Sequence, residues 1–151
     1  SGQDRLLVLI DYTKPSTEKR FYILDLLQKK LLLSTYVAHG RGSGDNYAVA
    51  FSNRPGSYQS SLGFFRTGDT YMGKNGYSLF LDGLEKGIND KARERAIVVH
   101  GANYADPAVL KGQQRLGRSL GCPALPPDIS KQVIDTIKGG VLLYIYGLNK
   151  A

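Results

Sequence analysis

A chain of 151 residues, of which 42% are hydrophobic and 22% charged, has the size and composition of one globular domain, which excludes a disordered protein. No apolar run approaches the roughly 18–20 residues that cross a bilayer, so we expect no transmembrane segment. The formal net charge of +7 favours anionic partners such as nucleic acid, acidic lipid or an acidic cell-wall polymer, although it also fits solubility alone. Because the basic residues are dispersed along the chain, we predict no nucleic acid partner.

The first third of the chain carries three strand patterns with short connections between them. Arg5–Asp11 and Arg20–Asp25 are separated by a turn around Lys14-Pro15-Ser16, and Leu31–Val37 follows a polar break at Gln28-Lys29-Lys30. Connections of this length leave no room for crossover helices. We therefore predict an antiparallel meander.

The remainder of the chain continues the β-rich pattern and ends in one clear helix. That helix is predicted to open at Pro126-Pro127 and to end at Gly139-Gly140, with an apolar stripe at helical spacing between them. A second, short helix is expected between Asn89 and Arg95. Further strands are expected at Phe64–Thr67, Tyr77–Leu81, Ala96–His100 and Val141–Tyr146.

No repeat, linker or shift in composition marks an internal boundary, so we predict one domain over residues 3–151, with Ser1-Gly2 as a cloning remnant. The Gly-rich stretch from His39 to Gly44 lacks the Lys-Ser/Thr ending of a phosphate-binding loop. One cysteine and two histidines are too few for a protein-only metal site. We therefore predict neither a metal nor a cofactor.

The residues with chemical potential lie between His100 and Cys122. A strand ends at His100-Gly101, and the single thiol follows 22 residues later, between Gly121 and Pro123. A thiol becomes a strong nucleophile as its thiolate, and a nearby imidazole can take its proton. The glycine would let the backbone N–H groups of residues 121 and 122 point at a developing oxyanion. A small buried structural cysteine is the alternative, and both interpretations stay open at this point.

The ordered blocks of sequence around these residues are more specific. His100-Gly101 followed by Ser119-x-Gly121-Cys122 resembles the signature of L,D-transpeptidase (YkuD-type) catalytic domains, which is a His-Gly pair and then Ser/Thr-His-Gly-Cys. The stretches VAHGRGSG, FSNRPGSYQSSLGFFRTG, YMGKNGYSLFLDGLEKGIND and GRSLGCPAL resemble the murein branch of this family. The similarity extends from about Leu6 to Tyr146.

The chain departs from the family pattern at two positions and in one spacing. Leu120 stands where a histidine is common, Ala124 stands where an arginine is often found, and the interval from the histidine to the cysteine is longer than usual. Arg118 and Arg115 are candidates for the missing positive charge. The departures bear on substrate recognition more than on the nucleophile.

The resemblance implies a mostly β, sandwich-like catalytic domain with one or two short helices, which acts on peptidoglycan in the periplasm or cell envelope and is a target of carbapenems. Cys122 would attack the stem-peptide carbonyl before the terminal D-alanine, form a thioester and pass the acyl group to an amine of a neighbouring stem peptide. His100 would be the base, and the Gly101 carbonyl would orient its imidazole. The alternatives are a carboxypeptidase or hydrolase on the same scaffold and a non-catalytic murein-binding module.

Six further positions are candidates for contact with the substrate, each with a structural alternative. A histidine in a Gly-rich loop can contact a ligand or simply be hydrogen-bonded within the loop. A serine before the cysteine can donate to the substrate or form the turn. A tyrosine on the hairpin YMGKNGY can act as part of a lid or pack against the sheet. The candidates are His39, Ser61, Tyr71, Arg118, Ser119 and Gly121.

Overall fold

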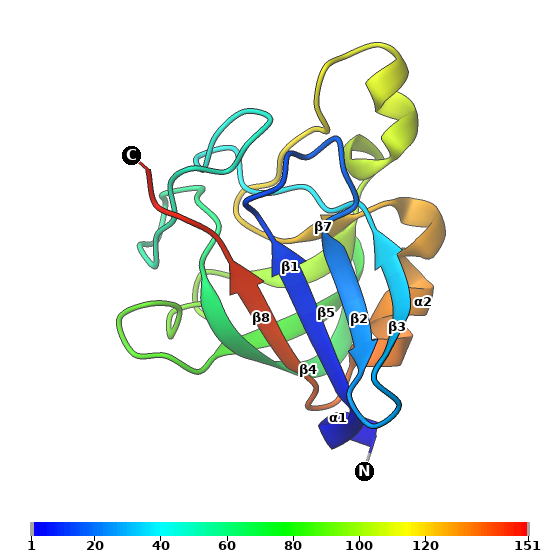
Figure 1. Cartoon of the computed structure of the whole chain (residues 1–151). Helices are drawn as coiled ribbons and strands as arrows, with labels where there is room; N and C mark the ends of the chain where they lie inside the picture. Colours follow the sequence, from blue (N-terminus) through cyan, green and yellow to red (C-terminus); the bar gives the residue numbers. More distant parts are fainter. Residues whose placement is uncertain (1, 151) are drawn as a thin grey trace.

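The computed structural model describes residues 2–150, which form one eight-stranded sheet with two α-helices and two 3₁₀ helices (Figure 1). The strand order is β3-β2-β1-β8-β4-β5-β6-β7. Two terminal residues lie outside the described residues. They are Ser1, which begins the predicted cloning remnant, and Ala151, which ends the predicted domain. The strands are β1 (Leu6–Asp11), β2 (Phe21–Asp25), β3 (Lys30–Thr35), β4 (Gly63–Gly73), β5 (Gly76–Gly83), β6 (Val98–Gly101), β7 (Ala124–Leu125) and β8 (Leu142–Tyr146). The helices are α1 (Gly2–Arg5), η1 (Asn103–Ala105), η2 (Pro107–Lys111) and α2 (Pro127–Ile137).

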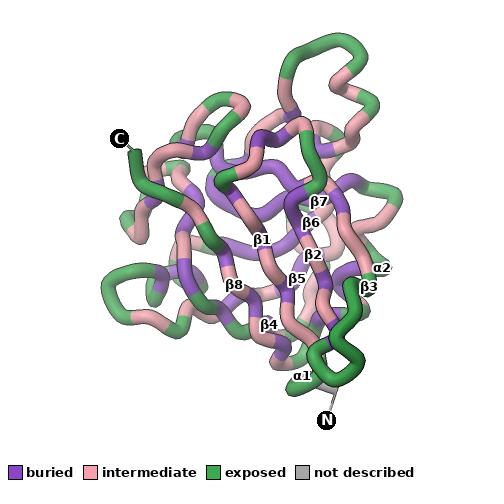
Figure 2. Tube along the Cα trace, in the orientation of Figure 1, coloured by how far each residue is buried: buried purple, intermediate pink, exposed green. Residues whose placement is uncertain are grey.

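The predicted N-terminal meander is confirmed, since β1 pairs antiparallel with β2 and β2 with β3. Side chains alternate between the two faces of a strand, and along β1 this alternation buries Val8 and Ile10 completely. Buried and half-buried positions alternate in the same way along β2 (Figure 2). On its other side β1 pairs in parallel with β8, so the last strand joins the meander to the rest of the sheet.

The β4–β5 hairpin is longer than the sequence pattern predicted. Its strands pair antiparallel as far as Gly73 opposite Gly76, with Lys74 and Asn75 at the tip. Gly76 has a φ of +82°, a conformation that side chains other than glycine rarely adopt, which explains the glycine after the turn. Beyond the hairpin, β5 pairs antiparallel with β6 and β6 pairs in parallel with the short β7.

The C-terminal helix α2 begins at Pro127, as predicted, and ends at Ile137, slightly before the glycine pair. Its buried face consists of Val133, Ile134 and Ile137, and the helix packs against β5 and β6. Thr67 of β4 closes its carboxyl end, because its Oγ1 donates to the Ile137 carbonyl at 2.6 Å.

The prediction of a short helix between Asn89 and Arg95 is wrong, since this segment is a series of turns. The side chain of Asn89 accounts for the difference. It is fully buried, its Nδ2 donates to the carbonyls of Leu62 and Phe64, and its Oδ1 accepts from the Glu85 N–H. These bonds to other segments hold the chain in turns rather than in a continuous helix.

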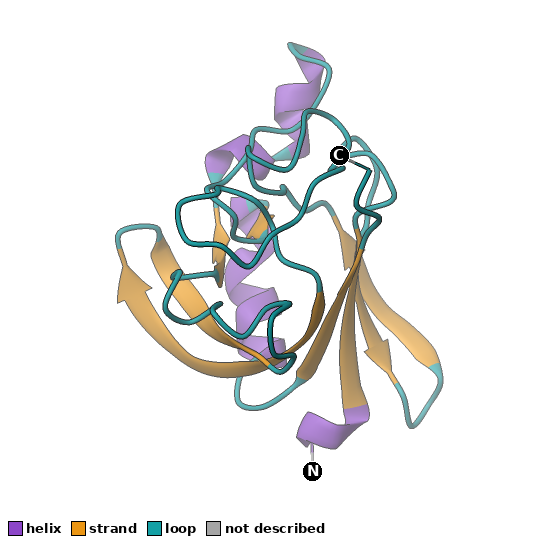
Figure 3. Ribbon diagram, turned by 90° about the vertical axis from the view of Figure 1, so that its left-hand side faces the viewer, coloured by secondary structure: helices purple, strands orange, loops and turns teal. Residues whose placement is uncertain are grey.

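The predicted architecture, a mostly β and sandwich-like domain, is confirmed. The sheet is strongly curved, so the half formed by β1, β2, β3 and β8 diverges from the β4–β5 half, and α2 lies between the two (Figure 3). One large apolar cluster fills the interior and draws on both halves and on α2. No helix within residues 2–150 is long and apolar enough to cross a membrane.

Candidate active site

Cys122 lies in a bend of the chain just before β7. The preceding Gly121 has a φ of +126°, and a Cβ at this position would lie 2.9 Å from Ile97 Cδ1 and 3.0 Å from the Gln59 carbonyl oxygen. Both the backbone conformation and the crowding require glycine here. The bend therefore fixes the direction in which the thiol projects.

The Cys122 thiol is held between two backbone groups that flank the start of β6. Its Sγ accepts a hydrogen bond from the Val98 N–H at 3.4 Å and donates to the Ala96 carbonyl at 3.3 Å. The residue is 8% exposed, and burial raises the pKa of the thiol, an effect opposed by the Val98 N–H and by the charges of Arg95 and Lys74. At rest this geometry accommodates the protonated thiol, because an S–H is needed to donate to the carbonyl.

His100, near the end of β6, has one ring nitrogen fixed. Its Nδ1 lies 2.9 Å from the Gly101 carbonyl oxygen. A carbonyl can only accept, so Nδ1 carries the hydrogen and Nε2 keeps its lone pair. Burial lowers the pKa of His100, so the neutral form is favoured near neutral pH. Nε2 makes no hydrogen bond within residues 2–150, and it keeps some accessible surface, since no buried side-chain nitrogen in this part of the chain lacks a partner.

Pairing between β6 and β7 brings His100 and Cys122 to the same place. His100 lies opposite Ala124, and its N–H donates to the Pro123 carbonyl at 3.4 Å. Both side chains line one cavity of about 360 Å³, which we call the Cys122 cavity. Within residues 2–150 no hydrogen bond joins the two side chains. Four further members of the lining are Tyr71, Lys74, Arg95 and Arg118.

Ser119 lines the cavity and uses its hydroxyl to shape the bend. Its Oγ donates to the Cys122 carbonyl at 2.6 Å and accepts from the Gly121 N–H at 3.1 Å. The second bond corrects the expectation that the Gly121 N–H is free to stabilise an oxyanion. The Cys122 N–H has no partner among the described residues and keeps that capacity.

Arg118 and Arg115 are the two candidates for the positive charge that Ala124 does not supply. Arg118 lines the cavity, and Arg115 does not. Arg115 pairs with the exposed carboxylate of Asp45. Arg118 makes only long contacts from one nitrogen, at 3.3 Å to the Gly44 carbonyl and 3.5 Å to the Arg41 carbonyl. Its guanidinium therefore keeps donors for a ligand.

Tyr71, near the tip of the β4–β5 hairpin, also lines the Cys122 cavity. Its ring stacks on Phe80 with centroids 4.3 Å apart, so it both packs on the sheet and borders the cavity.

The side chains of His39 and Ser61 do not line the Cys122 cavity, which argues against direct contact with a ligand there. His39 is 1% exposed; its Nδ1 lies 2.8 Å from Arg20 Nη2, and its Nε2 lies 2.9 Å from the Asp45 carbonyl oxygen. The backbone of His39 does support the site, because its carbonyl accepts from the Ser119 N–H at 3.0 Å. Ser61 is buried and holds Arg95, which is part of the lining.

Sequence reasoning missed several residues of the cavity. Lys74 and Asn75 sit at the tip of the hairpin YMGKNGY, which was the one available signal for them. Arg95 and Tyr104 had no such signal, because their place in the lining depends on contacts between distant segments. Leu120 lines the cavity and is 52% exposed, so the residue that replaces the family's histidine offers an apolar surface.

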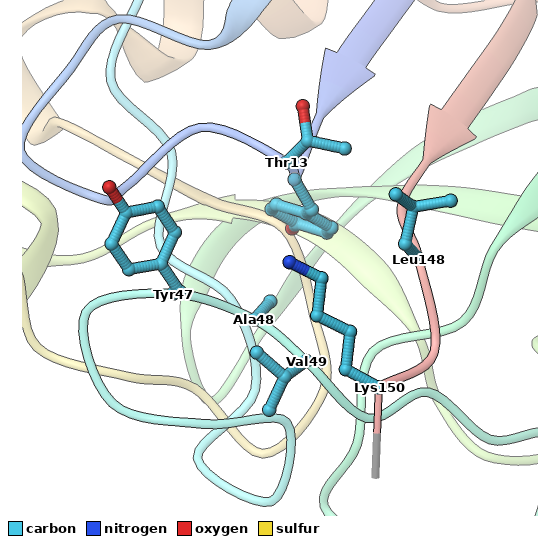
Figure 4. A pocket seen from close by; sticks show the side chains of 7 residues that line it. Thr13, Tyr47, Ala48, Val49, Leu148 and Lys150 are labelled. Atoms are coloured by element: carbon cyan, nitrogen blue, oxygen red, sulfur yellow. The ribbon is translucent and has the colours of Figure 1, made fainter.

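Two other cavities bear on the assignment. One of about 460 Å³ shares Lys74, Asn75, His100 and Tyr104 with the Cys122 cavity, and we call it the Tyr77 cavity after another lining residue. Another of about 300 Å³ is lined by Thr13, Tyr47, Lys150 and apolar side chains (Figure 4). The latter contains neither the cysteine nor a histidine and shares no residue with the Cys122 cavity.

Comparison with known proteins identifies a related family and a related fold. Residues 1–146 match the model of the L,D-transpeptidase catalytic domain, and no curated protein matches the chain. An L,D-transpeptidase from Mycobacterium smegmatis superposes with a TM-score of 0.56 at 13% identity, covering 95% of this chain and 59% of that one. Pgp2, the helical cell shape determining protein of Campylobacter jejuni, gives 0.62 at 15% identity, covering 96% and 48%. An L,D-transpeptidase from Stackebrandtia nassauensis gives 0.56 at 14%, covering 96% and 57%.

The three similar structures establish the fold, and the chain spans 48–59% of their lengths.

Proposed function

Since the chain belongs to the L,D-transpeptidase catalytic domain family, we propose that it is a cysteine-dependent peptidoglycan L,D-transpeptidase. One observation carries this proposal: the only thiol and an imidazole with a free Nε2 line the same cavity. A structural cysteine would need neither the open cavity nor the neighbouring base. We place the activity in the periplasm or cell envelope, where peptidoglycan lies.

The first half of the proposed reaction forms an acyl-enzyme. Nε2 of His100 takes the proton of the Cys122 thiol, and the thiolate attacks the stem-peptide carbonyl before the terminal D-alanine. The Cys122 N–H is a donor for the negative oxygen of the tetrahedral intermediate. His100 returns the proton to the departing amine, D-alanine leaves, and a thioester to Cys122 remains.

The second half transfers the acyl group. The amine of a neighbouring stem peptide attacks the thioester, His100 takes the proton of that amine, and the Cys122 thiolate leaves and is reprotonated. The Tyr77 cavity supports a separate place for the acceptor, because it borders the same imidazole from different lining residues. A hydrolase would need space for only a water molecule at this step.

The charges around the thiol suit an anionic donor. Lys74, Arg95 and Arg118 line the Cys122 cavity, and none of its lining residues among residues 2–150 is acidic. Stem peptides carry carboxylates, and arginine can bind a carboxylate through two parallel hydrogen bonds. We assign this contact to Arg118, whose guanidinium has only long contacts within the protein.

Incubation with purified disaccharide-tetrapeptide tests the function. We expect cross-linked dimers together with released D-alanine, and no product from Cys122→Ala. Disaccharide-tripeptide without dimers would identify the carboxypeptidase alternative. No product from folded wild-type protein, combined with retention on insoluble peptidoglycan, would favour the non-catalytic binding module and overturn the proposal.

A further inference from the structure

Arg95 lies directly beside the segment that carries the thiol. It immediately precedes Ala96, whose carbonyl accepts from Cys122 Sγ at 3.3 Å. Its Nη2 lies 3.5 Å from the point where a Cβ on Gly121 would stand. The guanidinium also lines the Cys122 cavity. Arg95 is therefore adjacent in sequence to a hydrogen-bond partner of the thiol, and its guanidinium lies close in space to the residue before Cys122.

The donors of Arg95 are almost all occupied by the protein itself. Nη1 donates to the Ser52 carbonyl at 2.9 Å and to Ser61 Oγ at 2.7 Å. Nη2 donates to the Gln59 carbonyl at 2.8 Å and to Ser57 Oγ at 3.2 Å. Four of the five N–H groups of a guanidinium are thus used, so this side chain is fixed and cannot grip a carboxylate with two parallel bonds.

All four of these partners are neutral, so the positive charge of Arg95 is left uncompensated. Within residues 2–150 no acidic side chain forms an ion pair with it. A half-buried guanidinium without a counterion favours the appearance of a negative charge nearby. The sulfur of Cys122 is the adjacent group that can acquire one.

The other titratable groups around the sulfur come from several different elements. Lys74 comes from the β4–β5 tip, His100 from β6, Tyr104 from η1 and Arg118 from the stretch before the bend. Buried Tyr12, after β1, completes the set and interacts with the thiol electrostatically. None of these groups is a carboxylic acid. Among the cationic side chains that line the cavity, Arg95 is the one whose guanidinium is held rigidly next to Gly121. In accord with this geometry, the charge of Arg95 lowers the pKa of Cys122 more than that of Lys74 does.

We propose that Arg95 is a positioning residue that stabilises the thiolate form of Cys122. The inference rests on the proposed function in taking Cys122 as the nucleophile. The proton leaves the sulfur for Nε2 of His100 or for water, and the negative charge that remains is offset by the fixed guanidinium and the Val98 N–H.

The test is the pH profile of Cys122 alkylation by iodoacetamide, in which the thiolate displaces iodide, followed by intact-protein mass spectrometry. We expect Arg95→Met and Arg95→Gln to raise the apparent pKa of Cys122 by about one unit, which slows alkylation below that pKa about tenfold. Arg95→Lys, which keeps the charge, should restore part of the rate. Arg93→Gln is the matched control, because Arg93 is exposed, pairs with Asp82 and does not line the cavity.

A second variant keeps Arg95 in place and changes a residue beside it. It tests the inference even if the substitutions of Arg95 prevent folding. Ser57→Asp puts a carboxylate where Nη2 already donates, so it should neutralise the guanidinium and raise the pKa of Cys122 as Arg95→Met does. Ser57→Asn is the uncharged control and should leave the profile unchanged.

An unchanged pKa in the folded Arg95→Met or Ser57→Asp protein would overturn the inference. This failure is distinct from failure of the proposed function. Dimers from wild type with an unshifted profile reject only the role of Arg95, whereas a shifted profile without any muropeptide product rejects only the transpeptidase activity.

Discussion

The two histidines of this chain are both buried, and burial lowers the pKa of each, yet the structure gives them different surroundings. Both ring nitrogens of His39 are engaged, Nδ1 by Arg20 and Nε2 by the carbonyls of Gly44 and Asp45. His100 has one nitrogen engaged by the Gly101 carbonyl and the other without a hydrogen bond within residues 2–150, and its side chain lines the Cys122 cavity. The unengaged nitrogen, rather than burial or a shifted pKa, therefore distinguishes a candidate base from a structural histidine.

Removal of the free nitrogen should have the largest effect. We expect His100→Ala to lower dimer formation by at least about 10²-fold, because general-base catalysis is lost while the thiol remains. The fold should survive, and a thermal melt checks this. His100→Ala that retains the wild-type rate would remove His100 from the mechanism and erase the distinction between the two histidines.

The second prediction concerns the pH dependence of stability through His39. Burial first, and then the charge of Arg20, lower its pKa to about 4, whereas in the unfolded chain it is about 6.5. The unfolded state therefore binds more protons between these values, so His39 contributes stability that is present above pH 6.5 and lost as the pH falls towards 4. The full loss is on the order of 3 kcal/mol.

Urea denaturation of wild type and His39→Gln at several pH values measures this loss. The variant should be less stable at pH 7, since it disturbs the hydrogen bond to buried Arg20, and its stability should fall less steeply between pH 6.5 and 4. Parallel pH dependences in the two proteins would show that His39 titrates normally.

The third prediction concerns Arg118, whose guanidinium keeps hydrogen-bond donors for a ligand. Arg118→Gln should raise the KM for the tetrapeptide about tenfold with little change in kcat, since a charge-assisted hydrogen bond to the substrate is lost. Steady-state kinetics measure both constants. A fall in kcat at constant KM would instead assign Arg118 to the chemical step.

The smallest effect is expected at Arg115, which pairs with exposed Asp45 and does not line the cavity. Arg115→Gln should change KM less than twofold and the free energy of unfolding by less than about 1 kcal/mol, as is usual for surface ion pairs. A tenfold rise in KM for this variant would mean that the wrong arginine has been assigned to the substrate.

The sequence indicated the family, the meander and the C-terminal helix, because these depend on local patterns and on ordered motifs. It also singled out His100 and Cys122, which line the same cavity. It did not indicate the role of Arg95, since the four partners of that guanidinium come from residues 52–61, more than 30 positions away. The turns between Asn89 and Arg95 were missed for the same reason: buried Asn89 bonds to segments that no local pattern connects to it. Burial of His39 against Arg20 is likewise a contact across 19 positions.

The mass of the intact protein after incubation with a carbapenem measures whether the buried thiol is a usable nucleophile. The proposed role of Cys122 predicts an increase equal to one drug molecule on wild type, formed slowly by His100→Ala and absent from Cys122→Ala. An unchanged mass for correctly folded wild-type protein would contradict the assignment of Cys122 as the attacking group.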